Sequence, residues 1–371
     1  MPGRQAGQLE RRAVLSGLAA LGVAACGQGS AGEALPAPID PPALKSLVPF
    51  PIGCAVTAEH LADPVYASLL THHVSQLTAE WEMKMEYILQ DDGSFRFDWP
   101  DAIADFARDK GLRLFGHTLV WYAQDPAAFR RLDGAGDAFA DAYHSYIFAV
   151  VARYRGRAVG WDVVNEPVAE HGDGLRESLW SRNLGPIDYM RRAFDQARLA
   201  DPAVVLLIND YNLERLPAKR TAFLRLVETL LKAGAPVGGI GTQSHIAADL
   251  PAGAIGASMR DLASLGLPIH VSELDISLNR GRGSFSADAQ LEARQARLAQ
   301  EIAEAFMALK PAQRFAFTTW GLRDKDSWLR GPKENPNPPW DAPLLFDDNG
   351  QAKPMFAALA AGFSGSDRRR F

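Results

Sequence analysis

The sequence contains only two cysteines, Cys26 and Cys54, which are too few for a disulfide framework. No Cys/His spacing typical of a metal site is present, so we expect neither a metal nor another cofactor. The chain also lacks a basic excess. Its net charge of −5 argues against nucleic acid as a partner. What it does have is length and apolar content, since 47% of its 371 residues are apolar, enough for a large core.

Residues 1–26 are predicted to be an export signal and are kept apart from the fold. Residues 10–15 have a twin-arginine pattern, followed by a small apolar run that is too short for a confident transmembrane helix. The plainer alternative is a buried first helix. The segment Val-Ala-Ala-Cys at 23–26 resembles a bacterial lipoprotein processing box, whereas ordinary cleavage nearby would make Cys26 incidental. We expect a periplasmic or cell-surface lipoprotein anchored at Cys26, or otherwise a secreted protein. Cys54 is then an inert buried thiol.

From Pro49 onward, short apolar runs alternate with longer amphipathic stretches, the pattern of repeated βα units around a parallel sheet. The predicted strands cover residues 51–56, 76–80, 113–121, 159–165, 204–209, 239–243, 269–273 and 315–320. Helical patterns cover residues 99–110, 137–153, 189–200, 218–234, 254–265 and 287–309, and several end at Gly111, Gly234 and Gly266. Eight strands are the number that closes a (β/α)8 TIM barrel, which is therefore the predicted fold.

We expect a single catalytic domain over residues 47–363, preceded by a Gly/Ala/Pro-rich linker at residues 27–46. The sequence has no internal repeat or low-complexity insert that would divide this domain. Residues 364–371 form a polar, basic tail. We expect a monomer.

Polar and aromatic side chains follow almost every predicted strand, and two of these segments carry a carboxylate at the end of an apolar run. They are residues 161–167 with Glu166, and residues 270–276 with Glu273. Because the C-terminal ends of barrel strands meet at one face, we expect both carboxylates to reach one pocket. Two such groups are the minimum for cleaving a glycosidic bond, since one protonates the leaving oxygen and the other attacks the sugar or supports its cation. The other strand ends supply Glu80, Trp81, Lys84, His117, Trp121, Asn165, Asn209, Asp210, Tyr211, Gln243, His245, Asp275 and Trp320.

Each of these residues has a plainer explanation when it is taken alone. A single glutamate at a strand end is more often a helix cap or an ion-pair partner, and a single histidine or tryptophan is more often part of the core. Their joint occurrence at one end of successive strands favours a sugar-binding cleft, where rings stack on sugar faces and polar groups bond hydroxyls. A metal cluster of His117, Glu166, His245 and Glu273 is disfavoured, because the four lack the local ligand spacing of such sites.

At this level of detail the chain resembles the retaining endo-xylanases of glycoside hydrolase family ten over nearly everything after Pro49. The resemblance rests on an ordered set of motifs. They are Glu-Trp-Glu-Met-Lys (80–84), Gly-His-Thr-Leu-Val-Trp (116–121), Trp-Asp-Val-Val-Asn-Glu-Pro (161–167), Asn-Asp-Tyr-Asn (209–212), Gly-Thr-Gln-Ser-His (241–245), Ser-Glu-Leu-Asp (272–275) and Thr-Trp-Gly-Leu-Arg-Asp-Lys-Asp-Ser-Trp (319–328). Any one of them is weak, but the ordered set is specific.

The resemblance implies that Glu166 is the general acid/base and Glu273 the nucleophile. An acid must be protonated at rest, whereas the nucleophile must stay ionised among hydrogen-bond donors. By the same resemblance His245 donates to Glu273, and Asp275 sets the protonation of His245. The remaining positions match residues that bind the substrate: Asn165 on the sugar 2-hydroxyl; Glu80, Lys84, His117 and Gln243 on the non-reducing side; Trp121, Trp320 and Trp328 as aromatic walls; and Tyr211 as a platform on the leaving-group side.

The chain departs from the family at three positions near the cleft. Members usually carry asparagine where this chain has Trp81, tryptophan where it has Met85, and histidine where it has Tyr122. Losing the asparagine removes a buried polar contact to the second sugar, at a cost of about 1–3 kcal/mol. We also expect Arg323 to add a cation near the same region, favouring a substituted or acidic side group on the substrate.

The leading hypothesis is a retaining endo-1,4-β-xylanase that hydrolyses xylan through a covalent glycosyl-enzyme. Two alternatives stay open. One is a surface lipoprotein that binds xylan or xylo-oligosaccharides without cutting them, and the other is the same chemistry on β-glucan or aryl β-glycosides.

Overall fold

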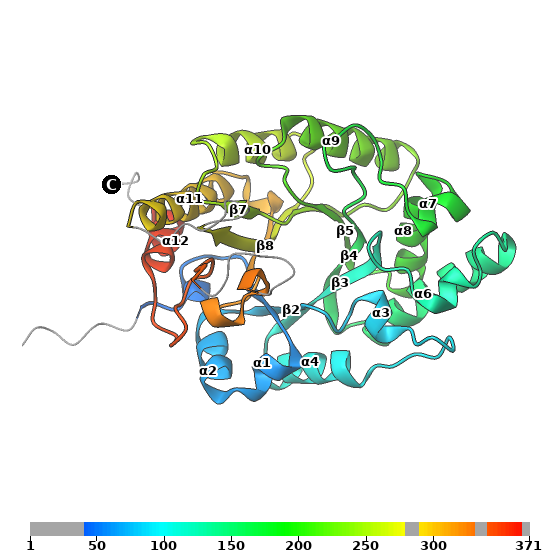
Figure 1. Ribbon diagram of the computed structural model, residues 1–371, viewed down its shortest axis with the longest axis horizontal. Coiled ribbons are helices and arrows are strands. Elements are labelled where there is room, and N and C mark those ends of the chain that lie inside the picture. Colours follow the sequence, from blue (N-terminus) through cyan, green and yellow to red (C-terminus); the bar gives the residue numbers. More distant parts are fainter. Residues whose placement is uncertain (1–40, 279–288, 331–339, 366–371) are drawn as a thin grey trace, which may run out of the picture. The chain divides into compact units, whose positions relative to one another are not determined.

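The computed structural model describes residues 41–278, 289–330 and 340–365 (Figure 1). The predicted export signal, the linker up to residue 40 and the tail from residue 366 lie outside the described residues, so export and lipidation at Cys26 stay predictions. The compact unit begins at Pro41. Leu44, in the first 3-10 turn, is 1% exposed and joins the core, so the packed barrel takes in residues ahead of 47.

Parallel strands close a barrel in the order of the chain, and this confirms the predicted fold. The strands are β1 (Ile52–Val56), β2 (Gln76–Ala79), β3 (Arg113–Trp121), β4 (Ala158–Asn165), β5 (Val205–Asp210), β6 (Gly239–Thr242), β7 (His245–Ala247), β8 (Ile269–Ser277) and β9 (Arg314–Thr319). Neighbouring strands pair around the barrel, and β9 pairs back with β1. The sixth barrel position is split, because β6 and β7 both pair with β8 while Ser244 between them has a φ of 59°.

Helices between the strands cover the outside of the barrel (Figure 1). They are α1 (Ala58–Ala62), α2 (Pro64–His73), α3 (Met85–Ile88), α4 (Asp98–Asp109), α5 (Ala127–Arg130), α6 (Asp137–Arg153), α7 (Leu179–Leu184), α8 (Asp188–Ala200), α9 (Pro217–Lys232), α10 (Ala254–Ala263), α11 (Ala289–Met307) and α12 (Pro354–Ser364). Short 3-10 turns occur at Leu44–Ser46, Pro311–Gln313, Asp324–Asp326 and Trp328–Arg330. Gly111, Gly234 and Gly266 have φ values of 67°, 79° and 73°, so the predicted helix stops are confirmed.

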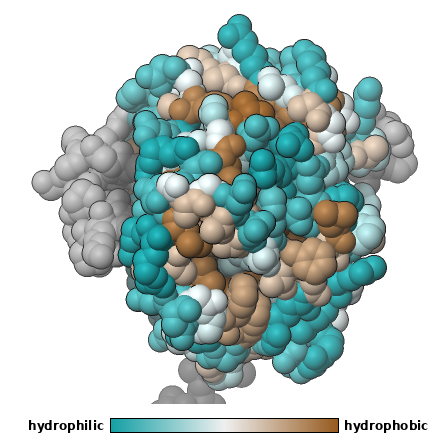
Figure 2. All heavy atoms as spheres, turned by 90° about the vertical axis from the view of Figure 1, so that its right-hand side faces the viewer, coloured by the Kyte–Doolittle hydropathy of each residue, from teal (hydrophilic) through white to brown (hydrophobic). Residues whose placement is uncertain are grey.

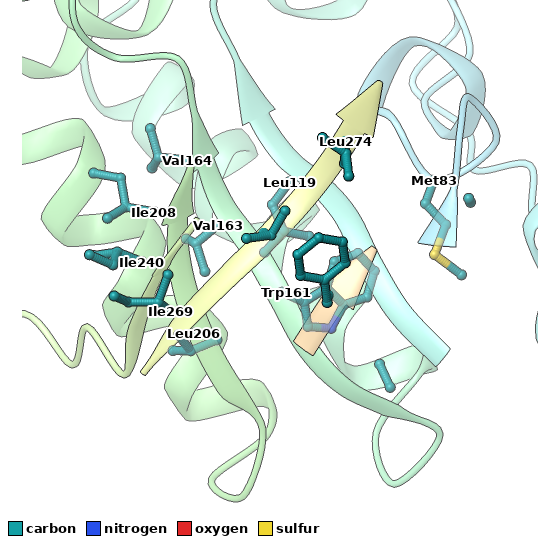
Figure 3. Close-up of a cluster of buried hydrophobic side chains, with 14 of the residues drawn as sticks. Met83, Leu119, Trp161, Val163, Val164, Leu206, Ile208, Ile240, Ile269 and Leu274 are labelled. Carbon is teal, nitrogen blue, oxygen red and sulfur yellow. The ribbon is translucent and has the colours of Figure 1, made fainter. Parts of the chain in front are cut away.

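The core is built from apolar side chains on neighbouring strands. Figure 3 shows buried side chains of β4, β5, β6 and β8 packed together, among them Val163, Leu206 and Ile240. Trp161 on β4 is fully buried, and a Cβ at Gly116 on β3 would lie 2.1 Å from its ring. The close approach of β3 to β4 therefore requires glycine at position 116.

The structure bears on two predictions, the inert thiol of Cys54 and the end of the seventh predicted strand. Cys54 on β1 is fully buried, and burial raises the pKa of its thiol to about 12, as expected for an inert cysteine. The seventh predicted strand ends at Glu273, but β8 continues to Ser277 because its last residues pair with β7, including Asp275 with His245. This extension places Asp275 inside a strand with no exposed surface.

The surface on the side of α6 and α7 is a mixture of hydrophilic and scattered apolar residues (Figure 2). Over residues 41–278, 289–330 and 340–365, none of the helices has the length and apolar character needed to cross a membrane.

Candidate active site

A cleft of about 310 Å³ opens at the C-terminal ends of the barrel strands. Most of the side chains predicted from strand ends line it, together with two of the departures from the family pattern. The lining comprises Trp81, Lys84, His117, Trp121, Tyr122, Asn165, Glu166, Tyr211, Gln243, His245, Glu273, Trp320 and Trp328. Sequence positions as remote as 81 and 328 therefore share one cavity. Four of the residues predicted from strand ends, Glu80, Asn209, Asp210 and Asp275, are buried and do not belong to this lining.

Glu273, predicted as the nucleophile, is 4% exposed and surrounded by donors. Its Oε1 accepts a hydrogen bond from Asn209 Nδ2 at 2.8 Å, and its Oε2 pairs with His245 Nε2 at 3.2 Å. His117 Nδ1 lies 4.0 Å from Oε1. Burial on its own raises the pKa of this carboxyl, but the positive surroundings outweigh burial and lower the pKa to about 2. Glu273 is thus ionised at neutral pH, as a nucleophile must be.

Behind Glu273, a buried chain of hydrogen bonds holds His245. Asp275 Oδ2 accepts from His245 Nδ1 at 2.7 Å and from Trp328 Nε1 at 2.8 Å. Burial lowers the pKa of His245, but the carboxylates of Asp275 and Glu273 outweigh burial and raise it to about 9. His245 is therefore an imidazolium at neutral pH and donates from both ring nitrogens. The geometry agrees with the support expected for Glu273.

Glu166, predicted as the acid/base, follows β4 with a φ of 56°, in the left-handed region that non-glycine residues rarely occupy. Its backbone is fixed on both sides: the N–H donates to the carbonyl of Asn209 at 2.8 Å, and the carbonyl accepts from Arg176 Nε at 3.1 Å. Its Oε1 accepts from Gln243 Nε2 at 2.9 Å and from Asn165 Nδ2 at 3.2 Å. Unusual backbone held by several partners is typical of a functional position.

Three amide side chains connect the two carboxylates. Asn209 Nδ2, which donates to Glu273, also lies 3.0 Å from Asn165 Oδ1. Asn165 and Gln243 both donate to Glu166. Ser272 adds a hydroxyl that donates to Asn209 Oδ1 at 2.8 Å. The acid and the nucleophile are therefore positioned by one network, and moving any of its amides affects both.

Aromatic rings surround Lys84 on one side of the cleft. Lys84 Nζ lies 4.8 Å from the ring centroid of Trp121, 4.9 Å from that of Trp81 and 5.7 Å from that of Trp320. Burial lowers the pKa of Lys84, against the pull of the carboxylates around it. Burial also raises the pKa of Glu80 to about 8, although Lys84 opposes the rise. With its pKa raised, Glu80 adds less negative charge next to Lys84 than an ordinary carboxylate would.

The three departures from the family pattern have different surroundings. Trp81 is 39% exposed and lies on the wall of the cleft. Tyr122 also lies there, with the guanidinium of Arg176 stacked 4.1 Å from its ring centroid. Met85, by contrast, is 2% exposed and belongs to the core. The changes at Trp81 and Tyr122 therefore alter the binding surface directly.

The expectation for Arg323 is wrong. Its guanidinium donates to Asp63 at 2.8 Å and to Asp326 at 2.6 Å, it packs over Tyr66, and the residue is only 4% exposed. Both partners are carboxylates of this protein. The cation therefore stabilises the loop after β9 instead of facing a substrate. The pairing with Asp63 spans 260 positions, which the local motif could not indicate.

Sequence reasoning gave no role to several residues that shape the site. Asn209 stood in a quoted motif, but its contact with Glu273 depends on the barrel register. Arg176 lies in a loop with no pattern around it, yet besides bonding Glu166 it donates to the Tyr211 hydroxyl at 2.9 Å. Asp162 accepts from His117 Nδ1 at 2.9 Å and thereby orients that ring. The one sequence signal for a role of Asp162 was its position as a charged residue inside an apolar strand.

Comparison with known proteins places this geometry in a family. Residues 44–361 match the model of glycosyl hydrolase family 10. The chain belongs to this family. It is 38% identical to endo-1,4-beta-xylanase A of Thermoanaerobacterium saccharolyticum over 84% of this chain and 26% of that protein. It is 37% identical to an endo-1,4-beta-xylanase of Geobacillus stearothermophilus over 83% of this chain and 94% of that one.

Solved structures give the same result. A thermostable mutant of the xylanase Xyn10A from Cellvibrio japonicus superposes with a TM-score of 0.79 and 33% identity, covering 87% of this chain and 99% of that one. A mutant of TsXylA from Thermoanaerobacterium saccharolyticum, solved with xylotetraose, has a TM-score of 0.77 and 37% identity, covering 86% and 98% of the two chains. The chain spans only about a quarter of the first two curated relatives, 26% and 28% of their lengths.

Proposed function

We propose that this member of glycosyl hydrolase family 10 is a retaining endo-1,4-β-xylanase, with Glu273 as nucleophile and Glu166 as acid/base. The observation that carries the proposal is that two carboxylates with different surroundings face one cleft. Glu273 is held ionised by cationic neighbours, whereas the side chain of Glu166 accepts its hydrogen bonds from the neutral amides of Gln243 and Asn165. Such a difference between paired carboxyls separates a nucleophile from a proton donor. The xylanases among its relatives support xylan as the substrate.

In the first step, an oxygen of Glu273 attacks the anomeric carbon of the sugar at the cut. The bond from that carbon to the leaving oxygen breaks, its electron pair goes to the leaving oxygen, and the proton of Glu166 neutralises it. The family resemblance supports a contact between the sugar 2-hydroxyl and Asn165, whose Nδ2 is 3.2 Å from Glu166. A contact there strengthens as the sugar becomes oxocarbenium-like.

In the second step, water replaces the departed sugar. Once Glu273 is esterified its negative charge is gone, so Glu166 can hold a negative charge more easily and removes a proton from the water. The water oxygen then attacks the anomeric carbon, and the pair of the ester bond returns to Glu273. His245 stabilises the carboxylate as it re-forms, because it keeps its proton through its bond to Asp275.

The test is hydrolysis of defined xylo-oligosaccharides by Glu273→Ala. We expect the rate to fall by about 10⁴-fold or more while the circular dichroism spectrum remains that of the folded protein. Glu228→Ala is the matched control, since that glutamate is 53% exposed on α9, outside the cleft lining. Full activity in Glu273→Ala would end the assignment. Proton NMR of the first product formed by the unaltered enzyme should give the β-anomer, because two displacements restore the configuration.

The same products decide between the alternatives. A binding protein without hydrolysis would hold xylo-oligosaccharides and release no shortened ones. An enzyme directed at β-glucan would cut a soluble cellulose derivative faster than xylan. Export by the twin-arginine signal, the lipid anchor at Cys26 and the monomeric state stay predictions from the sequence.

A further inference from the structure

The two most exposed tryptophans of the described residues share one groove. Trp81 and Trp99 are 39% and 46% exposed, whereas the other six tryptophans of the chain are buried or half-buried. Both line a cavity of about 400 Å³ between α1, the loop after β2 and the start of α4, and α1 lies next to α4 (Figure 1). Large aromatic side chains left in water next to each other indicate a binding surface.

This groove lies next to the catalytic cleft. Trp81 lines both cavities, so its indole is their common wall. In the cleft its ring faces Lys84, with Nζ 4.9 Å from the centroid, and in the groove it faces Tyr87, with ring centroids 6.4 Å apart. By the family resemblance Lys84 lies toward the non-reducing end of the substrate, so a polymer extending that way would reach Trp81 and then the second cavity.

The walls of the groove are held in place. The carboxylate of Glu82 is buried and accepts hydrogen bonds from the backbone N–H of Ala58 at 2.7 Å and of Trp81 at 3.3 Å. It thereby fastens the loop after β2 to the N-terminus of α1. On the opposite wall the guanidinium of Arg96 packs 4.3 Å from the ring centroid of Trp99. A groove with fixed walls loses little conformational entropy when it binds a ligand.

The chemistry of the groove fits a neutral sugar. Its lining combines three aromatic rings with acceptor oxygens, and it consists of Thr57, Ala58, Glu59, Trp81, Glu82, Tyr87 and Trp99. Aromatic rings offer flat apolar faces to the C–H faces of pyranoses, and carboxylates accept from sugar hydroxyls. Two glutamates stand in this lining, and the guanidinium of Arg96 that packs on Trp99 is paired with Asp98 at 3.8 Å, so an acidic substituent on the ligand is disfavoured.

We propose that the Trp81–Trp99 groove is an accessory subsite that binds unsubstituted xylose units at the non-reducing end of a long xylan chain. The proposal rests on the function proposed above and extends it to substrate length. Trp81, at the position where family members carry asparagine, connects this subsite to the cleft. Chains too short to pass Trp81 gain nothing from the groove, whereas longer chains gain the contact with Trp99.

The experiment compares Trp99→Ala with the unaltered enzyme on a short and a long substrate. On an aryl β-xylobioside, kcat/KM should stay within about twofold, whereas on xylohexaose it should fall by about three- to tenfold, the loss of one stacking contact. Phe148→Ala is the matched control, because Phe148 is 47% exposed on α6 and lies outside both linings. That variant should behave like the unaltered enzyme on both substrates.

Calorimetry separates this proposal from the assignment of the reaction. Xylohexaose binding is measured in the Glu273→Ala background with and without Trp99→Ala, and the dissociation constant should rise by the same three- to tenfold, about the value of one aromatic contact. If the unaltered enzyme cuts no xylo-oligosaccharide but this binding difference persists, the groove stands and the hydrolytic function fails. If Trp99→Ala and Phe148→Ala agree on the long substrate and in binding, the groove binds no xylan and the proposal is overturned.

Discussion

Replacing Asp275 by asparagine should shift the pH range over which the nucleophile is supported. Asp275 Oδ2 accepts two hydrogen bonds, from His245 Nδ1 at 2.7 Å and from Trp328 Nε1 at 2.8 Å. An asparagine with its carbonyl oxygen at that position keeps both bonds and removes only the charge. The change therefore isolates the electrostatic part of the contact between Asp275 and His245.

The magnitude follows from the pKa of His245. Burial alone lowers this pKa, yet the two carboxylates raise it from 6.5 to about 9, a net preference of about 3 kcal/mol for the proton. Asp275 is the larger of the two carboxylate contributions. Without its charge the pKa should fall by about two units, toward or below the ordinary value. Neutral His245, protonated at Nδ1, would then present an unprotonated Nε2 to Glu273 Oε2 at 3.2 Å.

The assay is the pH dependence of kcat/KM on a dinitrophenyl β-xylobioside, whose leaving group needs little proton donation. The alkaline limb then reports His245 and should move from about pH 9 to about pH 7 in Asp275→Asn. Activity at about pH 5.5 should change little, because His245 is protonated there in both proteins. Trp328→Phe, which removes a donor to Asp275 but no charge, should leave the limb in place. Coincident alkaline limbs for the unaltered enzyme and Asp275→Asn would refute the reasoning.

The free energy of unfolding should also depend on pH through His245, as expected for a group whose pKa is raised by folding. The pKa of His245 is higher in the folded state, so its proton stabilises the fold fully below about pH 6.5, and this contribution is lost as pH rises toward 9. Glu273 has the opposite sign: its lowered pKa gives stability above about pH 4.5 that is lost as pH falls toward 2.

Two further substitutions test the scaffold around the site. Lys219 and Asp210 are both fully buried, with Nζ and Oδ1 3.0 Å apart. Lys219→Met leaves this buried carboxylate without its cation, so the free energy of unfolding in urea should fall by about 3–5 kcal/mol. Adding Asp210→Asn should recover part of the loss, and a loss below about 1 kcal/mol in the single variant would contradict this account. Gly241→Ala would bring a Cβ to 2.2 Å from Asn209 Oδ1, so kcat should fall together with about 1–3 kcal/mol of stability. Gly256→Ala on α10, whose Cβ meets only the end of a flexible arginine side chain, should lower neither. An unchanged kcat in Gly241→Ala would show that Asn209 can move without affecting the nucleophile.

The barrel and most of the cleft could be predicted from the sequence because both depend on local patterns. Apolar runs that end in polar residues marked the strand ends, so Glu166, Glu273 and His245 could be assigned to one face from these runs alone. The helices α1, α2, α3, α5, α7 and α12 were not predicted. α12 is short and apolar on most sides, because it packs on α11, and it offers no clear amphipathic period.

Contacts between distant segments account for the errors and omissions. Arg323 carried a local signal for a free cation, and only its pairing with Asp63 removes it from the cleft. The role of Asn209 depends on how β5 and β8 face each other across the barrel, which no motif encodes. Tyr122 and Arg176 stack on each other, although 54 positions of sequence separate the two residues, and neither had been linked to the other.

The indole of Trp81 affects both the catalytic cleft and the groove of Trp99. By the family resemblance, replacing an amide by this indole would remove a polar contact of about 1–3 kcal/mol to the second sugar. In the structure the same indole gains Lys84 as a cation–π partner at 4.9 Å, a contact of about 0.5–2 kcal/mol. It also becomes the wall shared by the cleft and the groove of Trp99. In this proposal, binding energy lost at the second sugar is regained at Trp99, which only a long substrate can reach. The enzyme should depend on substrate length more strongly than a member with the amide.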